Sequence, residues 1–305
     1  MFCGQPVLAA DLGNDLPDRW AELELGEEDG KWAGRLGPGG HFKPGGCVAS
    51  TRVAILIPYR ERESHLATFI KYMHPFLMRH NIEYAILVVN QTDNAPFMRG
   101  LLFNAGFLSA SYVLPFSPDC LILHDVDNIP ERQGLLYRCS PHGVFHMAAA
   151  VDRFQYQLFM PEYTGGVAAV TSDQFSALNG FSNLYLGWGC EDDDFYIRIV
   201  DRGLTLNRVD PQVNYSYSNE NNPTHISHQI SRYRTLPHVP NYPNWFWDQG
   251  ISKLDRERFP NLQQIVDKDG SNTDRFDYNK FLQEGAGYRS GFVGNANYLR
   301  ISPLE

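Results

Sequence analysis

The first half of the chain alternates short apolar runs with segments of helical character, and this alternation restricts the fold more than any other feature. The apolar runs cover residues 52–58, 84–90 and 120–124, and the first of them stops at a proline. Residues 63–79 and 97–110 lie between the runs, and residues 63–79 carry apolar side chains at helical spacing. Strand, helix, strand, helix, strand is typical of an α/β domain. We therefore expect a Rossmann-like central sheet, parallel or mixed, flanked by helices.

The second half of the chain is less regular. We expect a strand over residues 165–170, a helix that starts within 172–178 and a further helix over 192–202. Residues 215–250 are polar and rich in His, Pro, Asn and Tyr, which predicts a long functional loop toward the C-terminus. Residues 1–48 are rich in Gly and acidic residues, and we interpret them as an irregular lead-in that packs on the domain.

Composition argues against several kinds of partner. The 305 residues are 43% apolar, which is enough for a substantial core, and the net charge is −9 with no basic block. Nucleic-acid phosphates need clustered Lys and Arg, so we expect no nucleic-acid partner. No apolar run approaches the roughly 18 residues of a membrane span, and no secretory signal pattern is visible at the start. We therefore expect any membrane association to depend on an anchor outside this chain.

The chain has five cysteines, Cys3, Cys47, Cys120, Cys139 and Cys190, and none of them forms a C-x-x-C pair. A zinc site is therefore not expected. Two disulfides in an oxidising compartment would leave one cysteine over. The alternative is five reduced, buried thiols.

Acidic residues directly follow the third predicted strand. His124 ends this strand, and Asp125 and Asp127 follow with Val126 between them. Ligands of open α/β sheets bind beyond the carboxyl ends of the strands. One carboxylate of such a pair can bind a divalent metal, and through it a diphosphate, while the other binds a ribose or sugar hydroxyl. The alternative is an acidic turn that caps the next segment.

His225 and His228 supply two imidazoles three residues apart, which face the same side of a helical or tight turn. With Asp127 they would form a mixed nitrogen and oxygen site suited to Mn²⁺ or a similar ion. The alternative is a pair of solvated loop histidines.

Several arginines follow strand ends or begin a helix. Guanidinium groups bind diphosphates through two parallel hydrogen bonds, although any single arginine can also be a plain surface residue. Tyr59, Phe97 or Val126 could pack against a uracil ring or belong to the core. The arginines in question are Arg60, Arg62, Arg99 and Arg153.

A Gly-Trp-Gly turn, Gly187 to Gly189, precedes four consecutive acidic residues, Glu191 to Asp194. Adjacent carboxylates repel one another and are tolerated in water, near cations, or where a raised pKa is useful. A carboxylate there could deprotonate an attacking sugar hydroxyl, while Trp188 offers an apolar face for a sugar ring. The alternative is a solvated helix start. Together with the D-x-D motif, the pattern indicates transfer of a sugar from a nucleotide diphosphate.

An ordered series of motifs over roughly residues 42–228 resembles the animal beta-1,4-galactosyltransferase family. Members are metal-dependent, inverting enzymes with a GT-A fold. The motifs are FKPGGC (42–47), RVAILIPYRERESHL (52–66), VVNQ (88–91), FMRGLLFNAGF (97–107), HDVD (124–127), YRC (137–139), VDRF (151–154), YTGGVAAV (163–170), NGF (179–181) and GWGCEDDDFYIRI (187–199).

The resemblance implies a nucleotide site and a metal site. Asp127 would bind Mn²⁺ with His225 and His228, Asp125 would contact the ribose or donor sugar, and Arg153 would meet the diphosphate. The other residues implied to line the nucleotide site are Pro58, Tyr59, Arg60, Arg62, Phe97, Arg99 and Val126.

The resemblance also implies the catalytic and sugar-binding residues. Asp192 would be the general base, with Glu191 and Asp193 holding acceptor and donor hydroxyls. The mobile loop that contains Trp188, together with Gly189 and Cys190, would close over the bound donor.

Donor choice and cellular location are implied in the same way. Tyr163 is an aromatic residue where galactose-using members carry one, which favours UDP-galactose over UDP-N-acetylgalactosamine. The family's two bridges would pair Cys3 with Cys47 and Cys120 with Cys139. These bridges imply a Golgi lumen, and a type II membrane protein if an anchor precedes the chain.

The resemblance therefore implies a beta-1,4-galactosyltransferase that uses UDP-galactose and an acceptor glycan or glycoside. The alternatives are a related UDP-N-acetylgalactosamine or UDP-glucose transferase, and an inactive scaffold subunit that binds UDP or sugar. We expect one catalytic domain over residues 49–305, with a nucleotide-binding part at about 49–130 and an acceptor and catalytic part at about 131–305. Met160 and Cys190 depart from the family pattern, and the segment after His228 matches nothing, which leaves the acceptor open.

Overall fold

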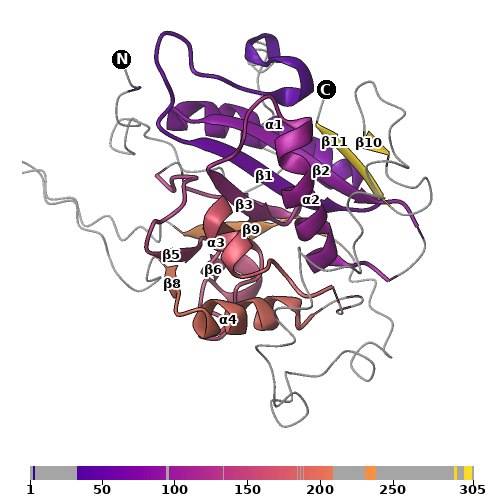
Figure 1. Ribbon diagram of the computed structural model, residues 1–305, viewed down its shortest axis with the longest axis vertical. Helices are drawn as coiled ribbons and strands as arrows, with labels where there is room; N and C mark the ends of the chain where they lie inside the picture. Colours follow the sequence, from indigo (N-terminus) through magenta and orange to yellow (C-terminus); the bar gives the residue numbers. More distant parts are fainter. Residues whose placement is uncertain are drawn as a thin grey trace, which may run out of the picture.

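An eight-stranded mixed sheet crosses the molecule in the order β10-β11-β2-β1-β3-β7-β5-β8, and a small three-stranded sheet has the order β4-β9-β6 (Figure 1). The computed structural model describes residues 3, 33–93, 96–132, 134–183, 185, 187, 189–208, 231–237, 292–293 and 299–303.

The large sheet consists of β1 (Arg52–Tyr59), β2 (Glu83–Gln91), β3 (Cys120–His124), β5 (Gly143–His146), β7 (Val167–Thr171), β8 (Thr205–Arg208), β10 (Phe292–Val293) and β11 (Leu299–Pro303). The small sheet consists of β4 (Asn128–Pro130), β6 (Ala150–Val151) and β9 (Arg232–Thr235). The α-helices are α1 (Glu63–Leu77), α2 (Arg99–Val113), α3 (Ser172–Ala177) and α4 (Glu191–Asp201). Short 3-10 turns are η4 (Ala33–Arg35), η5 (Pro38–Gly40), η6 (Met78–His80) and η7 (Asp152–Phe154).

The predicted fold class is confirmed. Strand β1 pairs in parallel with both β2 and β3, as expected for strands joined by crossover helices. Strand β7 runs antiparallel to β3, and β11 runs antiparallel to β2, so the sheet is mixed rather than purely parallel. The parallel strands end at one edge of the sheet, where the D-x-D motif follows β3.

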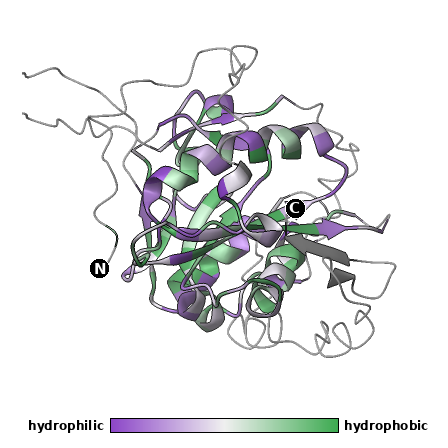
Figure 2. Cartoon of the chain, turned by 90° about the horizontal axis from the view of Figure 1, so that it is seen from above, coloured by the Kyte–Doolittle hydropathy of each residue, from purple (hydrophilic) through white to green (hydrophobic). Residues whose placement is uncertain are grey.

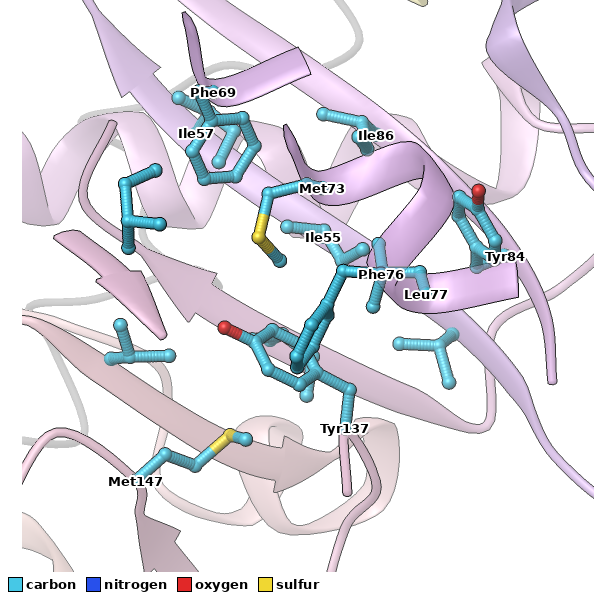
Figure 3. Close-up of a cluster of buried hydrophobic side chains, with 14 of the residues drawn as sticks. Ile55, Ile57, Phe69, Met73, Phe76, Leu77, Tyr84, Ile86, Tyr137 and Met147 are labelled. Carbon is cyan, nitrogen blue, oxygen red and sulfur yellow. The ribbon is translucent and has the colours of Figure 1, made fainter. Parts of the chain in front are cut away.

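Alternate residues of β1 point to opposite faces of the sheet, and both faces are covered. Ile55 and Ile57 pack with Phe69 and Met73 of α1 in one buried cluster (Figure 3). Leu56 belongs to a second cluster, which also contains side chains of α2. Burial on both faces explains why these strands are continuously apolar rather than alternating. Figure 2 shows hydrophobic residues concentrated along the sheet, with hydrophilic residues toward the outer surfaces of the helices.

Several boundaries differ from the sequence expectation. The helix expected from Phe97 begins at Arg99, and the helix expected from Asp192 begins at Glu191. The strand expected from Gly165 begins at Val167, because Gly166 takes a positive φ of 80° and turns the chain into the strand. The short strands β4, β5, β6, β8 and β9 were not predicted, since two to four residues are too few to show a periodic pattern. Strand β9 lies within residues 215–250, so the prediction of a loop there is wrong for this part.

The two predicted disulfides are confirmed. Cys3 pairs with Cys47 and Cys120 pairs with Cys139, and Cys190 takes part in neither. The first bridge ties the start of the chain to the segment before β1, and the second holds the start of β3. Among the described residues, no helix combines the length and the apolar character that a membrane crossing requires. The division into a lead-in and one catalytic domain remains a prediction.

Candidate active site

The D-x-D motif leaves β3 as a tight turn with an anchored main chain. The Asp125 amide donates to the Gly166 carbonyl oxygen at 2.9 Å, and the Leu236 amide donates to the Asp127 carbonyl oxygen at 2.7 Å. The Asn128 amide closes the turn on the Asp125 carbonyl oxygen at 3.2 Å. The motif is therefore clamped between the entry to β7 and the exit from β9.

A series of hydrogen-bonded, buried side chains contacts the main chain of the D-x-D motif. His124 lies 2.9 Å from the Asp125 carbonyl oxygen through Nδ1 and 2.9 Å from the Tyr137 hydroxyl through Nε2. A carbonyl oxygen only accepts, so Nδ1 carries the proton and Nε2 accepts from Tyr137. Tyr137 must then accept from the Tyr233 hydroxyl, 3.0 Å away. Burial lowers the pKa of His124 to about 4, so the ring is neutral and the direction of the chain is fixed.

Arg99, the first residue of α2, joins the D-x-D motif to the acidic cluster. Its Nε donates to Asp125 Oδ1 at 2.6 Å, and its Nη1 donates to Glu191 Oε1 at 3.2 Å. The Arg99 side chain is only 13% exposed, so both ion pairs are shielded from water. The two carboxylate-bearing segments therefore converge on one guanidinium, as the sequence analysis requires of a shared site.

Tyr163 and Asp192 meet over Gly165. A methyl group on Gly165 would lie 2.7 Å from both the Tyr163 hydroxyl and Asp192 Oδ2, and 2.6 Å from the Tyr163 ring. The Thr164 hydroxyl donates to the Asp192 carbonyl oxygen at 2.7 Å and ties this segment to the first turn of α4. Only a glycine allows the two functional side chains to approach each other here.

Arg153 completes the positive side of the site. Its Nη2 donates to the Tyr163 hydroxyl at 2.9 Å, and its guanidinium lies 4.8 Å from the centre of the Phe154 ring. Burial works to lower the Arg153 pKa, but Tyr163 and the carboxylates of Asp125 and Asp127 produce a net increase. Arg153 is therefore near the residues predicted to bind the diphosphate, the metal and the donor sugar.

Burial raises the pKa values of two carboxyl groups at the start of α4, those of Glu191 and Asp192. Glu191 is 6% exposed, and burial together with the Asp192 charge raises the pKa of its carboxyl to about 7. Burial also raises the pKa of Asp192, while Arg99 opposes the shift. Glu191 Oε2 is buried without a hydrogen-bond partner. The helix start is thus not a solvated acidic cap, because two of its carboxyls lie inside the site.

Replacing Glu191 with Gln should stabilise the protein at alkaline pH. The Glu191 pKa lies above its unfolded value of 4.5, so the folded protein binds this proton more tightly and loses stability as pH rises from about 4.5 through about 7. Gln removes that loss. We expect the melting temperature of Glu191→Gln to exceed that of the wild type by a few degrees at pH 8, with a smaller difference at pH 5. An equal difference at both pH values would contradict a raised pKa.

Other predicted nucleotide residues lie at the carboxyl end of β1 and before α2. The Arg60 guanidinium lies 5.5 Å from the centre of the Phe97 ring. Pro58 is buried in β1, and Tyr59 and Val126 belong to the core cluster under α1. Arg62 is the N-terminal flanking residue of α1, and its amide donates to the Tyr59 hydroxyl at 3.1 Å. The nucleotide roles of these residues remain predictions.

The turn before α4 approaches the same edge. The Gly187 amide donates to the Phe97 carbonyl oxygen at 2.8 Å, and Gly189 and Cys190 take positive φ values of 99° and 70°. Cys190 adopts this conformation as a non-glycine residue. The Asp193 amide donates to Asp192 Oδ1 at 3.1 Å. Trp188 lies outside the described residues, so its predicted role stays a prediction.

Only one of the three predicted metal ligands lies among the described residues. Asp127 lies at the site, whereas His225 and His228 lie outside the described residues. Within the described ranges, no three His, Cys, Asp or Glu side chains gather closely enough to hold a metal ion. After β9 the Leu236 amide donates to the Asp127 carbonyl oxygen, and His238 follows two residues later in the sequence.

His146 and Arg208 lie next to Tyr163 and were not predicted from the sequence. His146 ends β5 and Arg208 ends β8, and the two are partners across the parallel pairing of these strands. Both strands are four residues long, so no pattern predicted them. An isolated His at the end of a short apolar run was the only available signal.

Two protein-family models match this chain. A model described as the N-terminal region of glycosyl transferase group 7 matches residues 21–140, and one described as the N-terminal domain of galactosyltransferase matches residues 145–238. Together the two matched stretches take up more than half of the chain.

Curated relatives share the central part of the chain. Beta-1,4-galactosyltransferase 3 of Cricetulus griseus is 44% identical over 181 residues, which is 59% of this chain and 45% of that protein. A Lymnaea stagnalis protein named beta-N-acetyl-D-glucosaminide beta-1,4-N-acetylglucosaminyl-transferase is 46% identical over 170 residues, 56% of this chain and 34% of that one. The chain thus spans less than half the length of these relatives.

Among solved structures, a Drosophila beta-1,4-galactosyltransferase 7 in complex with manganese, UDP-Gal and xylobiose is 33% identical, with a TM-score of 0.48. The match covers 63% of this chain and 77% of that one. The family models and the curated relatives point to one group. The chain belongs to the beta-1,4-galactosyltransferase family.

Proposed function

We propose that this protein transfers galactose from UDP-galactose to the 4-hydroxyl of an acceptor sugar, with inversion at the anomeric carbon. The observation that carries the proposal is the Arg99 bridge, which brings Asp125 of the D-x-D motif and Glu191 of the acidic cluster to one guanidinium. Such a bridge joins a donor-binding edge to a cluster that contains a general base. Asp192, beside Glu191 and opposite Tyr163, is that base.

The charged residues of the site have separate roles in the proposed reaction. Asp192 accepts the proton of the attacking hydroxyl, and its raised pKa improves its strength as a base near neutral pH. Arg99 and Arg153 place positive charge near the D-x-D motif, where a leaving diphosphate gains negative charge. Glu191, with a pKa of about 7, keeps its proton for part of the time at neutral pH and can donate a hydrogen bond to a sugar oxygen.

The residues at the D-x-D motif fit a hard divalent cation such as Mn²⁺. Asp127 supplies a carboxylate, and the neighbouring Asn128 Oδ1 is a buried oxygen without a hydrogen-bond partner. Oxygen ligands of this kind suit Mn²⁺, Mg²⁺ and related ions, and an added imidazole favours Mn²⁺ among them. A bound cation would supply charge neutralisation for the UDP leaving group. Asp125 is paired with Arg99, and the family resemblance assigns the metal contact to Asp127.

One assay tests the proposal. The purified chain is incubated with radiolabelled UDP-galactose and Mn²⁺ over a panel of glucose, xylose and N-acetylglucosamine glycosides. We expect transfer to at least one of them, and loss of transfer when the metal is chelated. Binding of UDP without transfer to any acceptor would instead favour the inactive scaffold subunit.

The metal prediction has its own test. Asp127→Asn should weaken Mn²⁺-dependent activity by about tenfold to a hundredfold, because a carboxylate ligand is lost. Separate alanine variants of His225, His228 and His238 identify the imidazole ligand. Asp152→Asn is the matched control, since Asp152 lies nearby but bonds the Thr235 amide. An Asp127→Asn enzyme with an unchanged Mn²⁺ requirement would contradict the assignment.

Tyr163→Leu should widen donor use. The Tyr163 ring is held beside Asp192, and its removal creates room for an N-acetyl group next to the donor sugar. We expect the relative turnover of UDP-N-acetylgalactosamine to rise by at least about tenfold. Tyr156→Leu is a matched control, because Tyr156 bonds Glu131 instead. An unchanged donor preference would remove Tyr163 from the donor site.

A second candidate donor follows from the relatives. The Lymnaea stagnalis protein is as similar to this chain as the galactosyltransferases and is named for N-acetylglucosaminyl transfer. The family therefore includes members named for different donors, and the assay above must include UDP-N-acetylglucosamine. The aromatic Tyr163 supports galactose as the preferred sugar.

We further propose that the protein works in the Golgi lumen and, with an anchor outside this chain, as a type II membrane protein. The two disulfides support an oxidising compartment. Localisation of the tagged full-length protein by fluorescence tests this proposal, and a cytosolic distribution would contradict it.

A further inference from the structure

Two residues outside the predicted site hold the main chain that carries Tyr163. Arg208 Nη2 donates to the carbonyl oxygens of Pro161 and Tyr163, both at 2.7 Å. Arg208 Nε donates to His146 Nδ1 at 3.0 Å. His146 Nε2 lies 2.9 Å from the Gly165 carbonyl oxygen. Arg208 and His146 together therefore contact the carbonyl oxygens of Pro161, Tyr163 and Gly165.

The protonation of this pair is fixed by its partners. Arg208 can only donate, so His146 Nδ1 must be the acceptor. The remaining proton then lies on Nε2, which donates to the Gly165 carbonyl oxygen. Burial, with Arg208 as the second cause, lowers the pKa of His146 to about 3, and the ring is fully buried. The imidazole is thus neutral across the working pH range and has one tautomer.

The Tyr163 side chain is also held in place by its neighbours. Its hydroxyl accepts from Arg153 at 2.9 Å, and its ring meets the His146 ring edge-on with centres 5.4 Å apart. Phe154 and Phe159 contact the same ring edge-on at 5.8 and 5.7 Å. His146 therefore makes two kinds of contact. It donates a hydrogen bond to the main chain after Tyr163, and its ring packs against the Tyr163 ring.

We propose that Arg208 and His146 are positioning residues that set donor-sugar selectivity, by fixing the main chain on both sides of Tyr163. The proposal rests on the proposed function, in which Tyr163 limits the space beside the donor sugar. A bulky ring excludes a larger sugar only when it cannot move aside. The three carbonyl contacts remove that freedom, because a shift of the segment would leave the half-buried Arg208 guanidinium and the buried His146 ring without acceptors.

The test compares two donors in the same variant. Arg208→Met keeps the length of the side chain and removes every donor, whereas Arg208→Lys keeps the charge and one donor group. Arg52→Met is the matched control. Arg52 pairs with Asp119 at the starts of β1 and β3, whereas the candidate site lies beyond the ends of these strands. The measured quantity is the ratio of kcat/KM for UDP-galactose to that for UDP-N-acetylgalactosamine.

We expect the ratio to fall about tenfold in Arg208→Met, to fall less in Arg208→Lys, and to stay unchanged in Arg52→Met. A purely structural role would lower both rates by the same factor, and this result would overturn the proposal. His146→Gln is a second variant for the case that Arg208→Met does not fold. Its amide can still donate toward the Gly165 carbonyl but no longer accepts from Arg208, so we expect an intermediate ratio.

A second measurement separates this proposal from the proposed function. Hydrogen exchange of the amides of residues 162–167 should be faster in Arg208→Met than in the wild type, with no change in β1 and β2. If the wild type transfers no sugar from either donor, the proposed function fails and donor selectivity fails with it, while faster exchange would still establish the restraint on the segment. Unchanged exchange would overturn the positioning role even in an active enzyme.

Discussion

Asp192→Asn should lower sugar transfer by about a thousandfold while UDP binding stays close to the wild-type value. An amide has the size of the carboxylate but cannot accept a proton from the acceptor hydroxyl. The Asp192 carbonyl oxygen keeps its bond from Thr164, and the amide oxygen can keep the bond from the Asp193 amide. The helix start should therefore remain in place. Radiolabelled transfer and UDP titration on the same preparation measure the two quantities.

The pH dependence gives an independent reading of the same residue. Asp192 acts as a base only when it is ionised, and burial raises its pKa. Activity of the wild type should therefore fall as pH decreases, at a pH above the ordinary range of an aspartate. Asp201→Asn is the matched control, because Asp201 is exposed at the end of the same helix. Full activity in Asp192→Asn would remove the general-base assignment.

Gly165→Ala should abolish most of the activity in a protein that still folds. The added methyl would overlap the Tyr163 ring and hydroxyl and Asp192 Oδ2, at 2.6 to 2.7 Å. Asp192 Oδ2 is the end of a short side chain and can turn away, whereas the Tyr163 ring is packed against His146, Phe154 and Phe159 and is displaced only at a cost in stability. The groups that must move are the proposed base and the proposed donor-limiting ring. A loss of roughly a hundredfold or more in kcat is expected, because small displacements at a reacting centre are costly.

Gly45→Ala is the control for Gly165→Ala, since a methyl at Gly45 meets nothing within 4 Å. Gly45→Ala should unfold at the wild-type temperature, whereas Gly165→Ala should unfold at a lower temperature but remain folded under assay conditions. Transfer activity should differ between them. If Gly165→Ala keeps normal transfer, then Tyr163 and Asp192 do not have to occupy these positions, and the proposed arrangement of the site is wrong.

The elements that the sequence predicted best are those that bury both faces. β1, β2 and β3 are continuously apolar, because α1 and α2 cover opposite faces of the sheet, and that pattern is visible in the sequence. The position of Asp125 after β3 followed directly. The small sheet of β4, β6 and β9 was invisible, because its strands have two to four residues and pair over long separations. Their pairing depends on the tertiary fold rather than on local preference.

The candidate site shows the same division. Asp125, Asp192 and Tyr163 were found because each stands in a motif. The two ion pairs of Arg99 could not be predicted, since nothing in the sequence reveals that Asp125 and Glu191 share one guanidinium. His146 and Arg208 stand in no motif and act through main-chain carbonyls, whose partners are set by strand pairing. The assignment of His225 and His228 remains a prediction.

The anomeric configuration of the product is the most direct test of the whole account. The donor-binding D-x-D edge and Asp192 are proposed to act on opposite sides of one glycosidic bond, so displacement must invert the sugar. Proton NMR of the product formed from UDP-α-galactose should show a β-linked galactose on the 4-hydroxyl of the acceptor. An α-linked product would contradict the placement of the base, whatever the rate of transfer.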